Sequence, residues 1–474
     1  MKLIGRKKEC DELNELLRVN RPQFVAVYGR LRVGKTYLIK RFFKDSFSFY
    51  VTGVKKMTPR ERLSAFGRAL GEAGYRSGGA PKNWPDAFAR LKELLQSDSV
   101  YREPSSGKRV VFIDELPWIA GKRGSFLKAL DEFWNKWGES QEDLLLIICG
   151  SATSWIIKNI IKDTGGYHDR VTKRMRILPF KIAECKALLD ENGVRFSDRE
   201  LIESYMVFGG IPYYLNLLSP SLSLSQNVQR LCFEESGDLR HEHIELLSSL
   251  FSNPSIHSAI LKALFGHPDG LVRVDLAKIK DIGDGEPLTT ALDELEQCGF
   301  IRAFPDFKKE KTGMLYQLID PFILFSYTYL NNRRVSDWMG FVGTPSYYVW
   351  GGHAFEALCM NHIREVKRAL GIEGVSTNEF SYHNAKGDKP FQIDLLIDRR
   401  DDVINLCEMK YSSSEYEMDA EEEKRIRRRL ERFRLLTKTR KTVRVTLITP
   451  YGLARNKHSG IADKEIAFVG DIMG

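Results

Sequence analysis

The chain has 474 residues, of which 43% are hydrophobic and 28% charged, and its formal net charge is +9. This length excludes a single small domain and predicts roughly two to four domains of ordinary globular composition. No apolar run is long enough to span a membrane and the polar N-terminus lacks a secretory signal, so we expect a cytoplasmic protein with no membrane partner. The positive charge favours a polyanionic partner; a mildly basic, solvated surface is the equally simple alternative.

The seven cysteines are scattered through the chain and never have C-x-x-C spacing. An odd number in such positions argues against a disulfide framework and against a zinc site. We expect most of them to be buried thiols in a reducing compartment.

Residues 1–180 alternate short apolar runs with amphipathic stretches, which predicts an α/β domain with a parallel sheet. Four runs are rich in β-branched or aromatic residues and nearly uninterrupted, as strands buried on both faces are. They are Phe24–Tyr28, Phe47–Val51, Val110–Ile113 and Leu144–Ile148.

The first run leads into Gly29-Arg30-Leu31-Arg32-Val33-Gly34-Lys35-Thr36, and a predicted helix, Tyr37–Phe43, follows. A Gly-x-x-x-x-Gly-Lys-Thr sequence between a strand and a helix is a P-loop. Backbone N–H groups would wrap the phosphates, Lys35 would reach the β- and γ-phosphates, and Thr36 would ligate Mg²⁺. We therefore predict binding of ATP with Mg²⁺. The cofactor-binding residues predicted here are Gly29, Arg32, Val33, Gly34, Lys35, Thr36 and Tyr37.

The strand Val110–Ile113 runs directly into Asp114 and Glu115. The carboxyl ends of parallel strands meet at one edge of a sheet, so both carboxylates are expected beside the phosphates. Asp114 would hold Mg²⁺, and Glu115 would orient the attacking water as a general base. The next strand ends in Cys149-Gly150-Ser151, where Ser151 would hydrogen-bond the γ-phosphate or the water. An ordinary turn serine is the simpler alternative for Ser151.

These motifs resemble the archaeal-type ATPases of the STAND/AAA+ group. The resemblance rests on Ile4-Gly5-Arg6-x-x-Glu9, the P-loop, Asp114-Glu115, Cys149-Gly150-Ser151 and Gly209-Gly210-Ile211-Pro212. It implies a helical lid that contains the Gly-Gly-x-Pro turn, with Pro212 over the adenine. It also implies that Arg170 is a sensor or finger arginine, acting within one chain or across a subunit boundary, which leaves oligomerisation open. The chain departs from the family pattern at Tyr167-His168-Asp169 and at Leu31.

The middle of the chain reads as helical, and Ser197-Asp198-Arg199-Glu200 has capping-box spacing. Beyond residue 239, helices near Ser255–Phe265, Val274–Ile279 and Pro287–Cys298, followed by a hairpin of Phe300–Phe304 with Met314–Leu318, have the order of a winged helix-turn-helix. The third of these helices carries three carboxylates and no Lys or Arg, so we favour a structural or protein-contact role over DNA reading. The hairpin tip, Phe307–Lys311, is the segment that could still contact phosphates.

Residues 345–474 have a different order, typical of a separate domain that mixes helices and strands. The predicted elements are a helix at Ala354–Leu370, strands at Glu379–His383, Gln392–Asp398 and Val403–Lys410, a charged helix at Met418–Thr437, and closing strands at Val443–Thr449 and Ile466–Val469. The basic stretch of the charged helix suits either a DNA-backbone contact or a solvated amphipathic helix.

Carboxylates recur in this last segment at Glu356 on the helix, at Asp394 inside a strand and at Glu408 at the end of the next strand. Residues two apart on a strand share a face, so Glu408 and Lys410 point together and Asp394 can join them. Asp394 and Glu408 would hold Mg²⁺, and Lys410 would position or deprotonate water, which suits phosphodiester cleavage. The catalytic set resembles the restriction-endonuclease-like PD-(D/E)xK fold, with Ile393 in place of the usual proline.

The expected fold is therefore α/β and multidomain. It comprises a P-loop NTPase parallel sheet over residues 1–180, a helical lid over 181–238, a winged helix-turn-helix over 239–335, and an α/β restriction-endonuclease-like domain over 345–474. The predicted function is an ATP-binding and ATP-hydrolysing switch coupled to a Mg²⁺-dependent DNA nuclease. The alternative is a non-cleaving, ATP-regulated DNA- or protein-binding regulator whose nuclease-like domain is an inactive scaffold.

Overall fold

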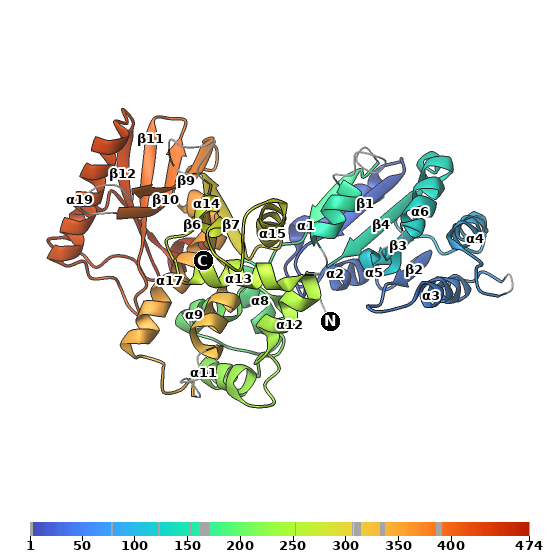
Figure 1. Ribbon diagram of the computed structural model, residues 1–474, viewed down its shortest axis with the longest axis horizontal. Coiled ribbons are helices and arrows are strands. Elements are labelled where there is room, and N and C mark those ends of the chain that lie inside the picture. Colours follow the sequence, from blue (N-terminus) through green and yellow to red (C-terminus); the bar gives the residue numbers. More distant parts are fainter. Residues whose placement is uncertain are drawn as a thin grey trace. The chain divides into compact units, whose positions relative to one another are not determined.

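The computed structural model describes residues 3–76, 79–121, 124–151, 153–161, 170–251, 253–305, 307, 314–331, 337–384 and 391–473. The chain forms two compact units, Met1–Pro179 and Phe180–Gly474 (Figure 1). No helix in the described ranges has the length and apolar character needed to cross a membrane. All seven cysteines lie in these ranges and each is a free thiol, in agreement with the prediction.

A five-stranded parallel sheet organises the first unit, which confirms the predicted α/β class. Its strand order is β2-β3-β4-β1-β5, and each neighbouring pair is parallel. The strands are β1 (Gln23–Tyr28), β2 (Phe49–Thr52), β3 (Arg109–Asp114), β4 (Leu144–Gly150) and β5 (Lys173–Arg176). The central strands β3 and β4 are buried along their whole length, as their uninterrupted apolar sequences predict.

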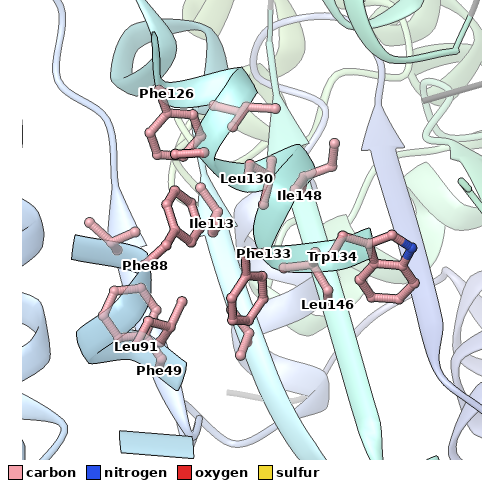
Figure 2. Close-up of a cluster of buried hydrophobic side chains, with 14 of the residues drawn as sticks. Phe49, Phe88, Leu91, Ile113, Phe126, Leu130, Phe133, Trp134, Leu146 and Ile148 are labelled. Carbon is pink, nitrogen blue, oxygen red and sulfur yellow. The ribbon is translucent and has the colours of Figure 1, made fainter. Parts of the chain in front are cut away.

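The helices of this unit connect the strands and cover the sheet (Figure 1). They are α1 (Lys7–Arg18), α2 (Lys35–Phe42), α3 (Pro59–Glu72), α4 (Trp84–Gln96), α5 (Leu116–Ala120), α6 (Ser125–Lys136) and α7 (Thr153–Ile156), with a 3₁₀ turn at Gly138–Ser140 and a π turn at Ile157–Ile161. Figure 2 shows Phe126, Leu130 and Phe133 of α6 packed against Ile113 of β3 and Ile148 of β4. This apolar contact fixes the two central strands from which the polar groups of the site emerge.

The second unit opens with short helices and continues into a small antiparallel sheet. The helices are α8 (Ile182–Glu191), α9 (Asp198–Phe208), α10 (Pro212–Leu215), α11 (Leu224–Val228), a π turn at Gln229–Phe233, α12 (Glu242–Leu250), α13 (Pro254–Phe265), α14 (Arg273–Ala277), α15 (Glu286–Gln297), α16 (Pro321–Phe325) and a π turn at Ser326–Leu330. The strands β6 (Leu271–Val272), β7 (Ile301–Pro305) and β8 (Met314–Leu318) have the order β6-β8-β7. Ser197 caps α9 in a capping box with Glu200, as predicted.

The last part of this unit is a mixed five-stranded sheet with the order β13-β12-β11-β10-β9. Its elements are α17 (Pro345–Asn361), α18 (Ile363–Ala369), β9 (Thr377–Asn384), β10 (Phe391–Arg399), β11 (Val403–Met409), α19 (Ala420–Thr437), β12 (Thr442–Thr449), a 3₁₀ turn at Ser459–Ile461, β13 (Lys464–Ala467) and a π turn at Phe468–Met473. β9, β10 and β11 are antiparallel neighbours, whereas β11, β12 and β13 run parallel.

Two predictions about this segment were wrong in detail. The single helix expected at Ala354–Leu370 begins earlier, at Pro345, and is divided into α17 and α18 at His362. The imidazole of His362 is fully buried and turned to a helix end in the same unit: its Nε2 accepts the N–H of Ile182 at 3.0 Å. The closing strand expected at Ile466–Val469 lies two residues earlier, at Lys464–Ala467, because a π turn takes up Phe468–Met473.

Candidate functional site

The P-loop connects β1 to α2, as the motif predicts, and its backbone explains its glycines. Gly34 is the N-cap of α2 with φ of 88°, in the left-handed region that favours glycine. Gly29 has φ of 150°, and a Cβ there would lie 2.2 Å from the carbonyl oxygen of Ile177. Arg32, a non-glycine residue between them, is also left-handed, with φ of 68°. The loop therefore turns tightly enough to direct successive N–H groups at one anion.

Lys35 and Thr36, the first residues of α2, make contacts that fit their predicted roles. Lys35 is 5% exposed, and its Nζ donates to the carbonyl of Arg30, within the loop, at 2.8 Å. The hydroxyl of Thr36 lies 2.9 and 3.0 Å from the two carboxylate oxygens of Asp114. A hydroxyl and a carboxylate are thus already paired where an oxygen-seeking cation would lie beside a bound phosphate. Burial raises the pKa of Asp114, and the hydrogen bond from Thr36 opposes that shift.

Glu115 and Ser151 lie at the same edge of the sheet, although they are 36 residues apart in the sequence. Glu115 follows β3 and Ser151 follows β4. The Ser151 hydroxyl donates to Oε2 of Glu115 at 2.8 Å, and the Ser151 N–H lies 3.3 Å from the same oxygen. Burial raises the pKa of the Glu115 carboxyl, while the Lys35 ammonium and the Ser151 hydroxyl counteract the shift. A carboxylate poised in this way is suited to accept a proton from water.

Arg6 belongs to this site, although no role was predicted for it beyond its place in the N-terminal motif. It is 4% exposed, and its guanidinium donates to the carbonyl of Val33 at 2.9 Å and to the carbonyl of Leu178 at 2.7 Å. Arg6 therefore links the P-loop, at Val33, to Leu178 at the end of the first unit. Its own φ of 58° is unusual for a non-glycine residue, and Gly5 before it is left-handed as well. The Ile-Gly-Arg sequence is the only signal that could have indicated this contact.

The remaining predicted nucleotide residues differ in what surrounds them. Val33 is buried, whereas Tyr37 is 39% exposed on α2. Arg170 forms an ion pair with Asp131 of α6, while Tyr167-His168-Asp169 beside it lie outside the described residues. Pro212 begins α10 in the second unit, so its contact with adenine stays a prediction. The Gly-Gly turn before it is tight, since a Cβ on Gly210 would lie 1.9 Å from the carbonyl oxygen of Phe180.

The second candidate site lies in the mixed sheet, where the predicted carboxylates come together. Leu395 of β10 pairs with Cys407 of β11, so Asp394 and Glu408 each lie next to this paired position on adjacent strands. Asp394 and Glu356 also line one cavity of about 430 Å³. Burial, together with the carboxylates of Glu356 and Glu408, raises the pKa of Asp394 to about 7, and the Arg429 guanidinium opposes the shift. Asp394 thus lies among other charged groups of this part of the protein.

The charged groups around Glu408 already have partners from α19, which the sequence reasoning did not anticipate. The Arg429 Nη1 lies 2.7 and 2.6 Å from the two carboxylate oxygens of Glu408. The Lys410 Nζ lies 3.6 Å from Glu408 but closer, 3.2 Å, to Glu422. In the described part of the chain, no group of three or more His, Cys, Asp or Glu residues is arranged to hold a metal ion. As arranged, the residues at Glu408 do not fit a divalent cation.

The first unit thus has an α/β fold with a parallel central sheet that resembles P-loop ATPases. Residues 3–218 match the family model described as an ATPase domain predominantly from Archaea. An uncharacterized protein of Methanocaldococcus jannaschii is 26% identical over 335 residues, which cover 69% of this chain and 68% of that protein.

Two solved structures are similar to this chain. A Walker-type ATPase of Pyrococcus abyssi has a TM-score of 0.49 and 18% identity, over 68% of this chain and 95% of that chain. The ORC2 protein of Aeropyrum pernix, in complexes with ADPNP and ADP, has a TM-score of 0.44 and 17% identity, over 68% of this chain and 91% of that chain.

Proposed function

We propose that this chain is an ATP-binding and ATP-hydrolysing switch. The observation that carries the proposal is the meeting of five polar residues at one edge of the parallel sheet. Lys35 and Thr36 follow β1, Asp114 ends β3 with Glu115 directly after it, and Ser151 follows β4. The match of residues 3–218 to an ATPase-domain family supports the same conclusion.

Nucleotide binding would use the loop and the start of α2. The Lys35 ammonium would leave the carbonyl of Arg30 for the β- and γ-phosphate oxygens, while loop N–H groups surround the phosphate. Thr36 and Asp114 fit Mg²⁺, since a hydroxyl and a carboxylate oxygen lie 2.9 Å apart beside the phosphate position. Bound there, Mg²⁺ would neutralise charge on the β- and γ-phosphates.

Hydrolysis would use Glu115 and Ser151. A water oxygen would bond to the γ-phosphorus as the bond from phosphorus to the bridging β–γ oxygen breaks, and Glu115 would accept the water proton. Ser151 holds the carboxylate by donating to Oε2, which fixes the direction from which water is deprotonated. Arg170 would stabilise charge on the transferred phosphoryl group after leaving Asp131.

The test of this proposal is ATP binding by the Lys35→Ala variant, measured by isothermal titration calorimetry with MgCl₂ present. Loss of a charge-assisted contact to phosphate should weaken binding by about 10- to 100-fold. The matched control is Lys136→Ala, which removes an ammonium that is 75% exposed on α6. Equal affinity of the wild type and Lys35→Ala would contradict the assignment of the P-loop.

In the second unit, we assign the segment from α13 to β8 to a winged helix-turn-helix and the final sheet to a nuclease-like domain acting on DNA. The mixed strand order and the location of Asp394 and Glu408 on the neighbouring strands β10 and β11 support the nuclease-like assignment, with Glu356 and Lys410 completing the proposed catalytic set. The exposed side of α15 carries Glu286, Asp293 and Glu296, which favours a protein partner over DNA for that helix.

A non-cleaving regulator is the second candidate, and the contact between Arg429 and Glu408 favours it. The two candidates differ in plasmid cleavage with MgCl₂, measured with and without ATP. A nuclease cuts the plasmid, and Glu408→Ala and Lys410→Ala abolish the cutting. Plasmid that stays intact with the wild type, or that Glu408→Ala and Lys410→Ala cut as fast as the wild type does, would contradict the nuclease and favour the non-cleaving regulator.

A further inference from the structure

Helix α19 presents one ordered face to the mixed sheet. Glu422, Ile426, Arg429 and Phe433 follow one another at intervals of four, three and four residues, which lie along one side of an α-helix. Ile426 and Phe433 are fully buried in two apolar clusters with residues of the sheet. These two apolar anchors hold the helix in register. Arg429, which lies between them, is thereby delivered to β11 at a fixed position.

Arg429 neutralises Glu408 from this position. Glu408 is 2% exposed, and both of its oxygens lie within 2.7 Å of a single Arg429 nitrogen. Glu422 balances the neighbouring cations: it pairs with Lys410 and also with Arg425. The charges therefore alternate along a continuous chain, Arg429 to Glu408 to Lys410 to Glu422 to Arg425. A buried carboxylate is costly without a counter-charge, and here α19 provides that charge.

A divalent cation and Arg429 compete for the same two oxygens. Mg²⁺ and Mn²⁺ bind to carboxylate lone pairs at close range, and the guanidinium already takes a hydrogen-bonding position on both oxygens of Glu408. A guanidinium in that position would also repel an incoming divalent ion, because the Glu408 carboxylate is buried, although the Arg429 side chain is 25% exposed. Arg429 docked on Glu408 therefore opposes binding of a divalent ion to the same carboxylate.

We propose that Arg429 is the built-in counter-cation of Glu408 and excludes divalent metal from this carboxylate while α19 is docked. The inference rests on the proposed nuclease-like site and adds a regulatory element to it. While α19 is docked, Arg429 contacts Glu408, and this carboxylate binds a metal ion only after Arg429 has moved away.

The test is Mn²⁺ binding, followed by electron paramagnetic resonance without nucleotide in a Thr36→Ala/Asp114→Ala background, which removes both residues proposed to hold metal in the first unit. Arg429→Met should bind Mn²⁺ about tenfold or more tightly than the parent chain, since it removes the competing charge. Arg429→Lys keeps a cation and should resemble the parent. The matched control is Arg428→Met, an exposed arginine one residue away on the same helix. Adding Glu408→Gln to Arg429→Met should abolish the gain.

Because Arg429→Met leaves the buried Glu408 with only the Lys410 ammonium, 3.6 Å away, as a counter-charge among the described residues, Arg429→Gln is measured beside it. This variant is neutral but still able to donate to the carboxylate. Thermal unfolding identifies any variant that fails to fold. Parent and neutral variants that bind Mn²⁺ equally well would overturn the blocking role of Arg429 while leaving the metal site of the proposed nuclease intact. Absence of Mn²⁺ binding from folded neutral variants would overturn both the inference and the metal-dependent nuclease.

Discussion

Glu115 occupies an uncommon backbone conformation at the end of a buried strand. Its φ of 47° lies in the left-handed region, which non-glycine residues rarely adopt outside turns and functional sites. The conformation turns the chain from β3 into α5 and leaves the carboxylate against Ser151 rather than in solvent. A Cβ on the neighbouring Gly53 would lie 2.5 Å from the Glu115 carbonyl oxygen, so β2 also approaches closely here. The surrounding backbone thus fixes the direction of the proposed base.

The pH dependence of ATP hydrolysis tests this placement. Burial raises the pKa of Glu115, so hydrolysis should fall as the pH drops through a value above the ordinary range of glutamate, because the protonated acid cannot accept a proton. The Ser151 hydroxyl lowers this pKa, so Ser151→Ala should move the inflection to higher pH. The measurement is the steady-state rate of phosphate release across the pH range, with Ser140→Ala as the control. An inflection that stays unchanged in Ser151→Ala would contradict the contact.

At the scale of elements, α17 contains two adjacent glycines with different surroundings. A Cβ on Gly351 would lie 2.7 Å from the ring of Tyr411, whose hydroxyl donates to Glu203 of α9 at 2.8 Å, whereas a Cβ on Gly352 would meet nothing within 4 Å. Gly351→Ala should therefore destabilise the protein by about 1–3 kcal/mol through overpacking, whereas Gly352→Ala should stabilise it by up to about 1 kcal/mol through helix propensity. Urea unfolding of both variants measures the difference. Equal effects of the two substitutions would contradict the packing of Tyr411 on α17.

The break between α17 and α18 places the His362 side chain at the N-terminus of α8. His362 Nδ1–H donates to the carbonyl of Leu358 at 2.8 Å, and Nε2 accepts the N–H of Ile182 at the start of α8. The neutral imidazole therefore satisfies an N–H group that the first turn of a helix leaves without a partner. Burial and the nearby Lys181 ammonium together lower the pKa of His362 to about 3.

The sign of the resulting pH effect follows from protonation of the unfolded chain. Below its ordinary pKa of about 6.5, His362 binds a proton when unfolded but not when folded, so its stabilising contribution is complete above that pH and is lost as the pH falls toward 3. This group alone lowers the free energy of unfolding by about 1.4 kcal/mol per pH unit below that value. His362→Gln should remove this dependence. The check is urea unfolding at pH 7.5 and 5.5; an equal pH-dependent loss in both proteins would contradict the neutral, buried histidine.

Across the whole molecule, the structural features that could be predicted from the sequence are those encoded by short, ordered motifs. The P-loop, Asp114 and Glu115 were predictable because a strand, a tight loop and a helix follow one another within a few residues. The parallel sheet was predictable because β3 and β4 are apolar without interruption. The order of Asp394 and Glu408 on adjacent strands was likewise visible from their spacing.

Contacts between distant segments could not be predicted in this way. Arg6 reaches Val33 and Leu178, and Arg429 reaches Glu408, across separations that leave no periodic signal in the sequence. The basic run of α19 shows six arginines within Arg425–Arg434, and only the packing of Ile426 and Phe433 determines that Arg429 is the one turned to the carboxylate. His362 divides a helix for a similar reason, because its partner Ile182 lies far away in sequence.

The second unit also connects its parts through buried polar contacts. Tyr411, directly after Lys410, binds Glu203 of α9, and His362 binds the start of α8. Tyr411 therefore links α9 to the residue after Lys410, and His362 links α8 to the break between α17 and α18.

Whether Glu115 is the general base for ATP hydrolysis is measured by single-turnover assays of the wild type and Glu115→Gln. Each protein is assayed with bound radiolabelled ATP and MgCl₂. The wild type should convert the bound ATP to ADP and phosphate. Glu115→Gln should retain ATP with an affinity close to that of the wild type, while turnover falls by about 100-fold or more, because the proton acceptor is gone but the phosphate-binding loop is intact. Turnover by Glu115→Gln at the wild-type rate, or a wild type that binds no ATP, would contradict an ATP-hydrolysing switch built on this sheet edge.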